Sequence, residues 1–90
     1  MNEEFNVGDI VESVSGHDKN RLFIIIGIDI SGKMIIIDGK YREKNKPKTK
    51  NPKHLIKIAH SEEILNKVNS PVATNAEIHK LIKAYKNVKE

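Results

Sequence analysis

A seven-residue run, Leu22–Ile28, holds only apolar residues and one glycine, and turn-forming residues flank it on both sides. Its length suits a β-strand, and its isoleucines are β-branched, which favours strands. Fourteen of the 90 residues are isoleucine, and cysteine is absent. We therefore expect one small β-rich domain, without disulfides or thiolate metal ligands.

Alternating and apolar segments predict five short strands separated by turns. The candidates are Ile10–Val14, Leu22–Ile28, Met34–Ile37, Lys40–Arg42 and Leu55–Ala59. Asp38–Gly39 predicts a two-residue type I′ hairpin turn into the fourth strand. The following segment, Glu43–Lys53, contains two prolines and alternating lysines, which predict an extended loop. Five strands in about sixty residues indicate a small curved barrel, because a sandwich needs about seven.

The last third of the chain changes to helical periodicity. Ser61 can cap a short helix, and Thr74 and Glu77 match a capping box for a second one. The second helix carries apolar residues at the spacing of a single face: Ile78, Leu81, Ile82 and Tyr85. We expect residues 60–90 to form a helical extension that packs on a barrel of residues 1–59, within one domain.

Positive charge is concentrated in the middle of the chain, although the net charge is only +4. Residues 1–18 contain five Asp or Glu and no Lys or Arg, whereas residues 40–57 contain eight Lys or Arg and one Glu. Such a block is typical of a contact with nucleic acid or with an acidic membrane surface. The alternative is a solvated, lysine-rich loop.

Two basic segments are candidates for phosphate contacts. The turn at residues 17–21 presents hydrogen-bond donors close together, at His17, Lys19, Asn20 and Arg21. In an extended chain, alternate residues share one side at about 6–7 Å, which is close to the phosphate spacing along one strand. A row with this alternation is formed by Lys44, Lys46, Lys48 and Lys50. Ordinary turn chemistry is the alternative for the first segment.

Tyr41 and Arg42 are candidates to stack on an unpaired base. A core or edge position for Tyr41 is the alternative. The chain has two Tyr, two Phe and no Trp, so an extended stacking platform is not expected.

No catalytic or metal-binding pattern is present in the sequence. The histidines are scattered, and the carboxylates Asp9, Glu12, Asp18, Asp29 and Asp38 fall mostly at turns, where Asp caps its own backbone. Phosphate-binding loops, nucleophile elbows and zinc-protease motifs are missing. We expect no enzyme activity, cofactor, metal or small-molecule substrate.

The glycine-containing turns carry a resemblance to a known family. Val7–Val11, then Gly16–Arg21 and the strand ending at Gly27, resemble the KOW motif of ribosomal proteins and transcription elongation factors. Ile35–Arg42 and Lys46–Leu55 are similar to the fourteen-e family of large-subunit ribosomal proteins. Asn20 stands where the KOW pattern usually has glycine, and asparagine tolerates the left-handed conformation expected there.

The resemblance implies a Src-homology-3-like barrel that binds RNA, namely ribosomal RNA of the large subunit, with ribosomal proteins as further partners. The residues expected to form turns are Gly8, Gly16, Gly27, Asp38 and Gly39. The expected RNA-binding residues are His17, Lys19, Asn20, Arg21, Lys40, Tyr41, Arg42, Lys44, Lys46, Lys48, Lys50, Lys53 and His54. Two alternatives are a transcription-elongation module that binds RNA polymerase or nascent RNA, and a protein-interaction barrel.

The amino terminus is acidic and lacks the apolar segment of a secretory signal. The longest unbroken apolar run, Leu22–Ile26, is too short to cross a bilayer. We therefore expect a cytoplasmic protein with no membrane partner.

Overall fold

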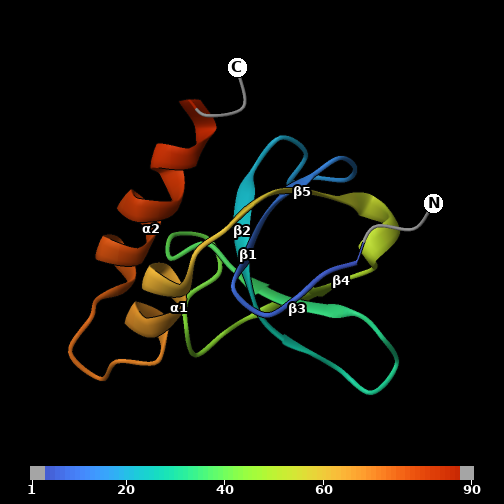
Figure 1. Cartoon of the computed structure of the whole chain (residues 1–90). Coiled ribbons are helices and arrows are strands. Elements are labelled where there is room, and N and C mark those ends of the chain that lie inside the picture. The colour runs from blue at the N-terminus through green and yellow to red at the C-terminus, as the bar shows by residue number, and fades with distance from the viewer. Residues whose placement is uncertain (1–3, 88–90) are drawn as a thin grey trace.

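The computed structural model describes residues 4–87, which form a five-stranded antiparallel sheet followed by two α-helices (Figure 1). The elements are β1 (Asp9–Ser13), β2 (Leu22–Ile28), β3 (Met34–Ile37), β4 (Lys48–Lys50), β5 (Leu55–His60), α1 (Glu62–Val68) and α2 (Asn75–Lys83), with 3₁₀ turns at Pro52–His54 and Ala84–Asn87. The strand order is β4-β3-β2-β1-β5. The predicted mainly-β fold, of the small Src-homology-3-like barrel type with C-terminal helices, is confirmed.

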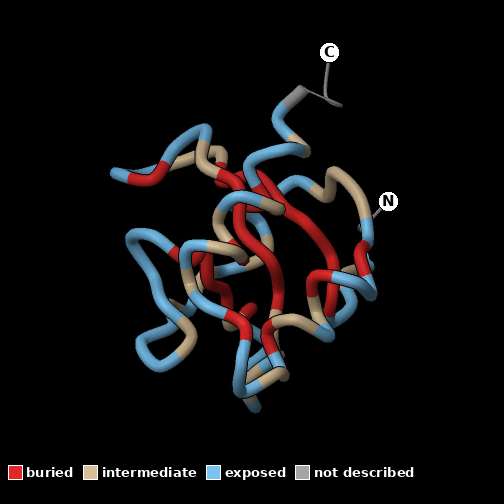
Figure 2. Tube along the Cα trace, turned by 90° about the vertical axis from the view of Figure 1, so that its left-hand side faces the viewer, coloured by how far each residue is buried: buried red, intermediate tan, exposed pale blue. Residues whose placement is uncertain are grey.

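The sheet is apolar on both faces, and a separate cluster buries each face. Successive residues of a strand point to opposite sides, so neighbours such as Ile10 and Val11 enter different clusters. One cluster joins the sheet to the helices and contains Ile10, Leu22, Ile24, Ile37, Ile64, Val68, Ile78 and Ile82. The other lies on the opposite face and contains Val11, Phe23, Ile25, Met34, Ile36 and Leu55. Figure 2 colours the buried residues of the trace red, among them all of β1 and the first four residues of β2.

Both helices begin at the residues that the sequence indicates. The Ser61 hydroxyl accepts a hydrogen bond from the Ile64 amide, and the Thr74 hydroxyl accepts one from the Glu77 amide, each at 3.1 Å. A salt bridge of 2.8 Å between Lys67 and Glu77 links α1 to α2. The helices lie together beside one face of the sheet (Figure 1), and their buried residues share one apolar cluster with residues of the sheet.

The connection after β3 differs from the predicted type I′ hairpin. The Asp38 carboxylate oxygen Oδ1 accepts hydrogen bonds from the amides of Lys40, Tyr41 and Arg42, at 2.8–2.9 Å. The Arg42 carbonyl in turn accepts from the amides of Asp38 and Gly39. These bonds close a wider turn, so the prediction of a returning strand at Lys40–Arg42 is wrong.

The strand that returns to β3 is β4 instead, with Met34 opposite Lys50 and Ile36 opposite Lys48. The expected loop at Glu43–Lys53 therefore contains this strand and part of the 3₁₀ turn Pro52–His54. Asn20 has a φ of 74°, as the resemblance predicts. Gly27 lies at a register shift between β2 and β3 rather than in a turn.

Both the backbone conformation and the close approach of α2 require glycine at position 39. Its φ is +82°, and a Cβ there would overlap the carbonyl oxygen of Asn75 and lie 2.8 Å from the His79 amide nitrogen. The turn after β3 is thus seated directly on the first turns of α2. Gly32 has a similar φ of +89°, but no atom lies within 4 Å of the position of its Cβ.

These two glycines make a matched pair for a stability measurement. Gly32→Ala should lower the free energy of unfolding by about 1–2 kcal/mol, the cost of a left-handed alanine. Gly39→Ala should lower it by about 3 kcal/mol or more, because the methyl group also forces the turn away from α2. Urea unfolding followed by circular dichroism measures both, and equal losses would contradict the seating of the turn on α2.

Candidate nucleic-acid interface

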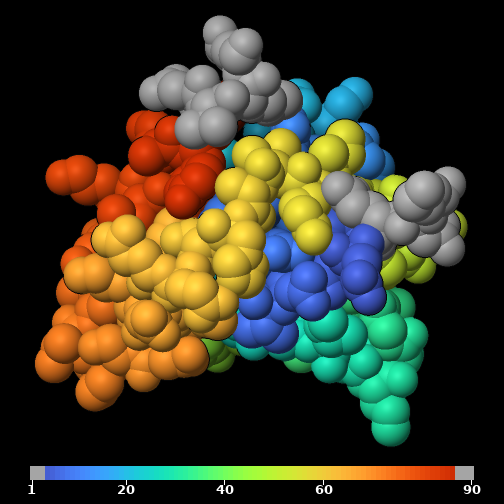
Figure 3. Space-filling view, in the orientation of Figure 1, coloured from blue at the N-terminus to red at the C-terminus, as the bar shows by residue number. Residues whose placement is uncertain are grey.

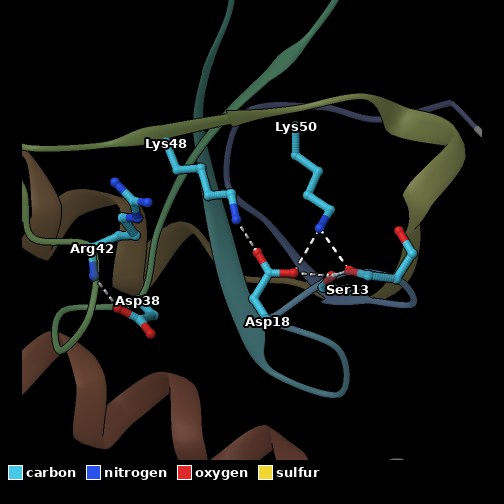
Figure 4. A network of polar contacts seen from close by, with 7 residues as sticks. Ser13, Asp18, Asp38, Arg42, Lys48 and Lys50 are labelled. Atoms are coloured by element: carbon cyan, nitrogen blue, oxygen red, sulfur yellow. Dashed lines mark hydrogen bonds and ion pairs between the residues drawn. The ribbon is translucent and has the colours of Figure 1, made fainter.

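The turn between β1 and β2 is tied to β4 through Asp18, as Figure 4 shows. Only 4% of Asp18 is exposed. Its carboxylate pairs with Lys48 Nζ at 2.5 Å and with Lys50 Nζ at 2.6 Å, and the Ser13 hydroxyl donates a further hydrogen bond at 2.6 Å. Asp18 is therefore a tertiary ion-pair partner, not simply the turn-capping carboxylate that the sequence predicts.

The charge of Asp18 is strongly favoured in the folded state. Burial opposes ionisation, but the hydrogen bonds from Lys48, Lys50 and Ser13 outweigh it and hold the pKa of Asp18 well below its usual range. Of the two lysines, Lys50 is the more deeply held, with a side chain that is 9% exposed. This internal pairing reduces the charge that Lys48 and Lys50 present to a ligand.

Lys44 also makes contacts within the protein. Its ammonium group donates to the carbonyl oxygens of Ser70 at 2.9 Å and Ala73 at 3.1 Å, and its amide donates to the Asn75 side chain at 2.8 Å. Lys46 is exposed but lies outside β4. The predicted row of four lysines on one side of an extended chain is thus limited to Lys48 and Lys50.

Tyr41 is exposed at 55%, so the alternative of a core position is wrong. The guanidinium carbon of Arg21 lies 3.9 Å from the centre of the Tyr41 ring, and Lys40 Nζ lies 5.0 Å from it. Both distances are within the range of cation–π attraction. The turn after β3 therefore presents an aromatic ring whose neighbours are cations.

Two hollows meet at Arg21 and Tyr41, which line both of them. The larger hollow, of about 260 Å³, is lined by Arg21, Leu22, Asp38, Lys40, Tyr41, His79, Ile82, Lys83 and Lys86. The smaller, of about 200 Å³, is lined by His17, Asp18, Arg21, Phe23, Tyr41, Arg42 and Lys48. We call this surface the Arg21–Tyr41 face. It combines cations from both halves of the chain with one exposed aromatic ring.

Six of the predicted RNA-binding residues line these hollows: His17, Arg21, Lys40, Tyr41, Arg42 and Lys48. Lys19 and Asn20 are exposed in the adjoining turn. Lys53 and His54 lie in the 3₁₀ turn after β4 and do not line either hollow. The Arg21–Tyr41 face is therefore built from the two turns, with little contribution from the lysine-rich loop.

Sequence reasoning missed the contribution of the C-terminal helical segment. His79, Lys83 and Lys86 line the larger hollow, although only packing on the barrel, and no part in RNA binding, was expected of this part of the chain. Their spacing of four and three residues places them on one helical face, beside the apolar stripe. The sequence signal that could have identified them is a row of basic residues next to the apolar face of the second helix.

A comparison with protein-family models found no match, and no curated protein matches the chain either. The KOW resemblance therefore stays a proposal. Within residues 4–87, no helix combines the length and apolar content needed to cross a bilayer. The same part of the chain contains no group of three or more His, Asp or Glu side chains that could hold a metal ion.

Asp18→Asn tests the ion-pair network. The substitution leaves the poorly hydrated Lys50 ammonium without its counter-charge, so we expect a loss of roughly 3 kcal/mol in the free energy of unfolding at pH 7. Folding lowers the pKa of Asp18, so the wild-type advantage is present above the unfolded pKa of about 3.9 and is lost as the pH falls further. Urea unfolding between pH 7 and pH 2 should show the two proteins converging below about pH 4.

The matched control is Asp29→Asn, which changes a partly exposed turn carboxylate whose Oδ1 accepts hydrogen bonds from the Ser31 amide, the Ser31 hydroxyl and the Lys33 amide. Its loss of stability should be much smaller than that of Asp18→Asn. A wild-type advantage over Asp18→Asn that persists unchanged to pH 2 would contradict the assignment of the charge to Asp18.

Proposed function

We propose that the protein binds RNA through the Arg21–Tyr41 face and works in the translation apparatus as a KOW-type ribosomal or ribosome-associated protein. The observation that carries the proposal is the convergence of cations from three distant chain segments around one exposed tyrosine. Phosphates are bound by such donors, and bases by aromatic rings and guanidinium groups. No catalytic step is part of this function.

The larger hollow favours an anionic ligand. Its lining includes the four cations Arg21, Lys40, Lys83 and Lys86, and of the described lining residues only Asp38 is acidic. Asp38 is 2% exposed, and its Oδ1 already accepts three backbone hydrogen bonds. The four cations outnumber this one carboxylate, so the lining keeps a net positive charge that attracts phosphate.

The resemblance to the fourteen-e family supports ribosomal RNA of the large subunit as the RNA, with ribosomal proteins nearby and a cytoplasmic location. Sedimentation of a cell lysate through sucrose gradients at low and high salt tests this part. Because phosphate contacts weaken steeply with salt, the protein should travel with the large subunit at low salt and leave it at high salt. A protein that stays at the top of the low-salt gradient would contradict a stable ribosomal role.

A second candidate function is protein binding through the turn between β2 and β3. Figure 3 shows this turn projecting at the lower right of the molecule. Ile30 in the turn is fully exposed, and Ile28 at its base is 46% exposed. This function corresponds to the transcription-elongation module or to a protein-interaction barrel. Nuclease treatment of a lysate separates the two candidates, since an association held by RNA dissolves and one held by protein persists.

The salt dependence of RNA binding tests the proposed face directly. We compare wild type with Lys83→Ser/Lys86→Ser on a fluorescein-labelled RNA stem–loop by fluorescence anisotropy. Each lost phosphate contact removes about 0.7–0.9 from the slope of log K against log salt, so the double variant should flatten the slope by about 1.5.

The matched control is Lys33→Ser/Lys80→Ser, which removes the same charge from two exposed lysines that line neither hollow. Its slope should stay close to that of wild type. Equal flattening by the two double variants would mean that the RNA responds to net charge alone, and the face would then have no special role.

A further inference from the structure

We infer that the larger hollow of the Arg21–Tyr41 face holds one unpaired nucleotide of the bound RNA, with its base against Tyr41 and its phosphate among the lysines. This inference rests on the proposed function and narrows it. It assigns a ligand class to the hollow and a role in RNA recognition to α2.

The hollow offers apolar and aromatic surface that a phosphate backbone does not need. Leu22 and Ile82, which are 7% and 1% exposed, belong to the core cluster between sheet and helices and form the floor of the hollow. Tyr41, in the turn after β3, is 55% exposed and adds an aromatic ring, one face of which the Arg21 guanidinium covers at 3.9 Å. Phosphates gain nothing from such surface, whereas a base presents a flat π-face that stacks on aromatic side chains.

The cations surround this apolar surface rather than forming a separate patch. Arg21 comes from the turn before β2, Lys40 from the turn after β3, and Lys83 and Lys86 from the C-terminal helical segment. A ligand that satisfies both kinds of lining carries a planar ring and an anion within a few ångströms of each other. A nucleotide has this combination.

The hollow is small enough to suit one nucleotide rather than several. Its volume of about 260 Å³ lies just below the range of small-ligand pockets, which begins at about 300 Å³. Bases within an A-form helix are stacked and cannot enter such a space, whereas bases in bulges, loops and single strands can be splayed out. The RNA recognised here therefore contains an unpaired nucleotide.

The aromatic side of the hollow is held in place before any ligand binds. Asp38 fixes the amides of residues 40–42, and its carbonyl oxygen lies 3.1 Å from His79 Nδ1 on α2. Gly39 allows this turn to approach the α2 backbone. Because the turn that carries Tyr41 packs on the backbone of α2, which carries Lys83, little backbone ordering is needed on binding, and preorganisation of this kind favours affinity.

The test compares two RNA hairpins that differ by one bulged 2-aminopurine, a fluorescent base. Wild type should bind the bulged hairpin at least fivefold more tightly than the fully paired one, which is the lower end of the range for stacking one base. The 2-aminopurine fluorescence should change on binding, because the base moves from the bulge to the tyrosine. Tyr41→Leu should abolish both the preference for the bulged hairpin and the fluorescence change.

Tyr41→Phe is the control, since it keeps the ring and should keep the preference for the bulge. Equal affinity for the two hairpins, or a preference that survives Tyr41→Leu, would overturn the unpaired-nucleotide site while RNA binding itself stands. Failure to bind either hairpin would overturn the proposed function as well. Adenosine monophosphate is titrated in parallel, and binding as tight as that of the bulged hairpin would assign the hollow to free nucleotides instead.

Discussion

The sheet is apolar on both faces, so each face must be buried against other parts of the protein. The packing of the whole molecule follows from this requirement. Curvature of the sheet encloses Val11, Phe23 and Ile25 on one face. The other face presents Ile10, Ile24 and Ile37, which the short helices bury with Ile64, Ile78 and Ile82. Because burial of apolar surface is the main favourable contribution to folding, the helices are part of the core and not an appendage.

The same packing creates the candidate interface. Once α2 covers the sheet, its basic stripe lies beside the turn that follows β3. Gly39 permits close approach of the two backbones, and the Asp38 carbonyl meets the His79 ring. Tyr41 and Arg21 then complete this surface. Its charges come from distant chain segments, since Arg21 and Lys83 are more than sixty residues apart in the sequence. The Arg21–Tyr41 face, which is the proposed binding surface, is thus a consequence of how the core is closed.

Local features of the sequence predicted much of the fold. The apolar run of β2, the caps at Ser61 and Thr74 and the left-handed Asn20 depend on neighbouring residues, and all are present. The prediction of a hairpin at Asp38–Gly39 was wrong because the Asp38 side chain, and not a neighbouring strand, accepts the hydrogen bonds of the amides of residues 40–42. That competition between side chain and backbone is local, but a dipeptide pattern does not decide it.

Long-range pairings account for what the sequence did not predict in the site. Asp18 meets lysines that lie 30 and 32 residues further along the chain, and Lys44 reaches carbonyl groups beyond α1. The alternation of lysines predicted that their side chains point outward on the same side. In the structure, the tertiary fold determines which groups these side chains contact. The charge pattern therefore predicted that this region is basic. Only the structure shows which of its cations can contact a ligand.

The most direct measurement is an amide NMR titration of the ¹⁵N-labelled protein with an RNA stem–loop that carries a bulged base. We predict that shift changes gather in three segments, at residues 17–21, 40–42 and 79–86, which meet at the Arg21–Tyr41 face. Changes concentrated in the turn between β2 and β3, or in the 3₁₀ turn at Pro52–His54, would contradict it and place the partner elsewhere on the molecule.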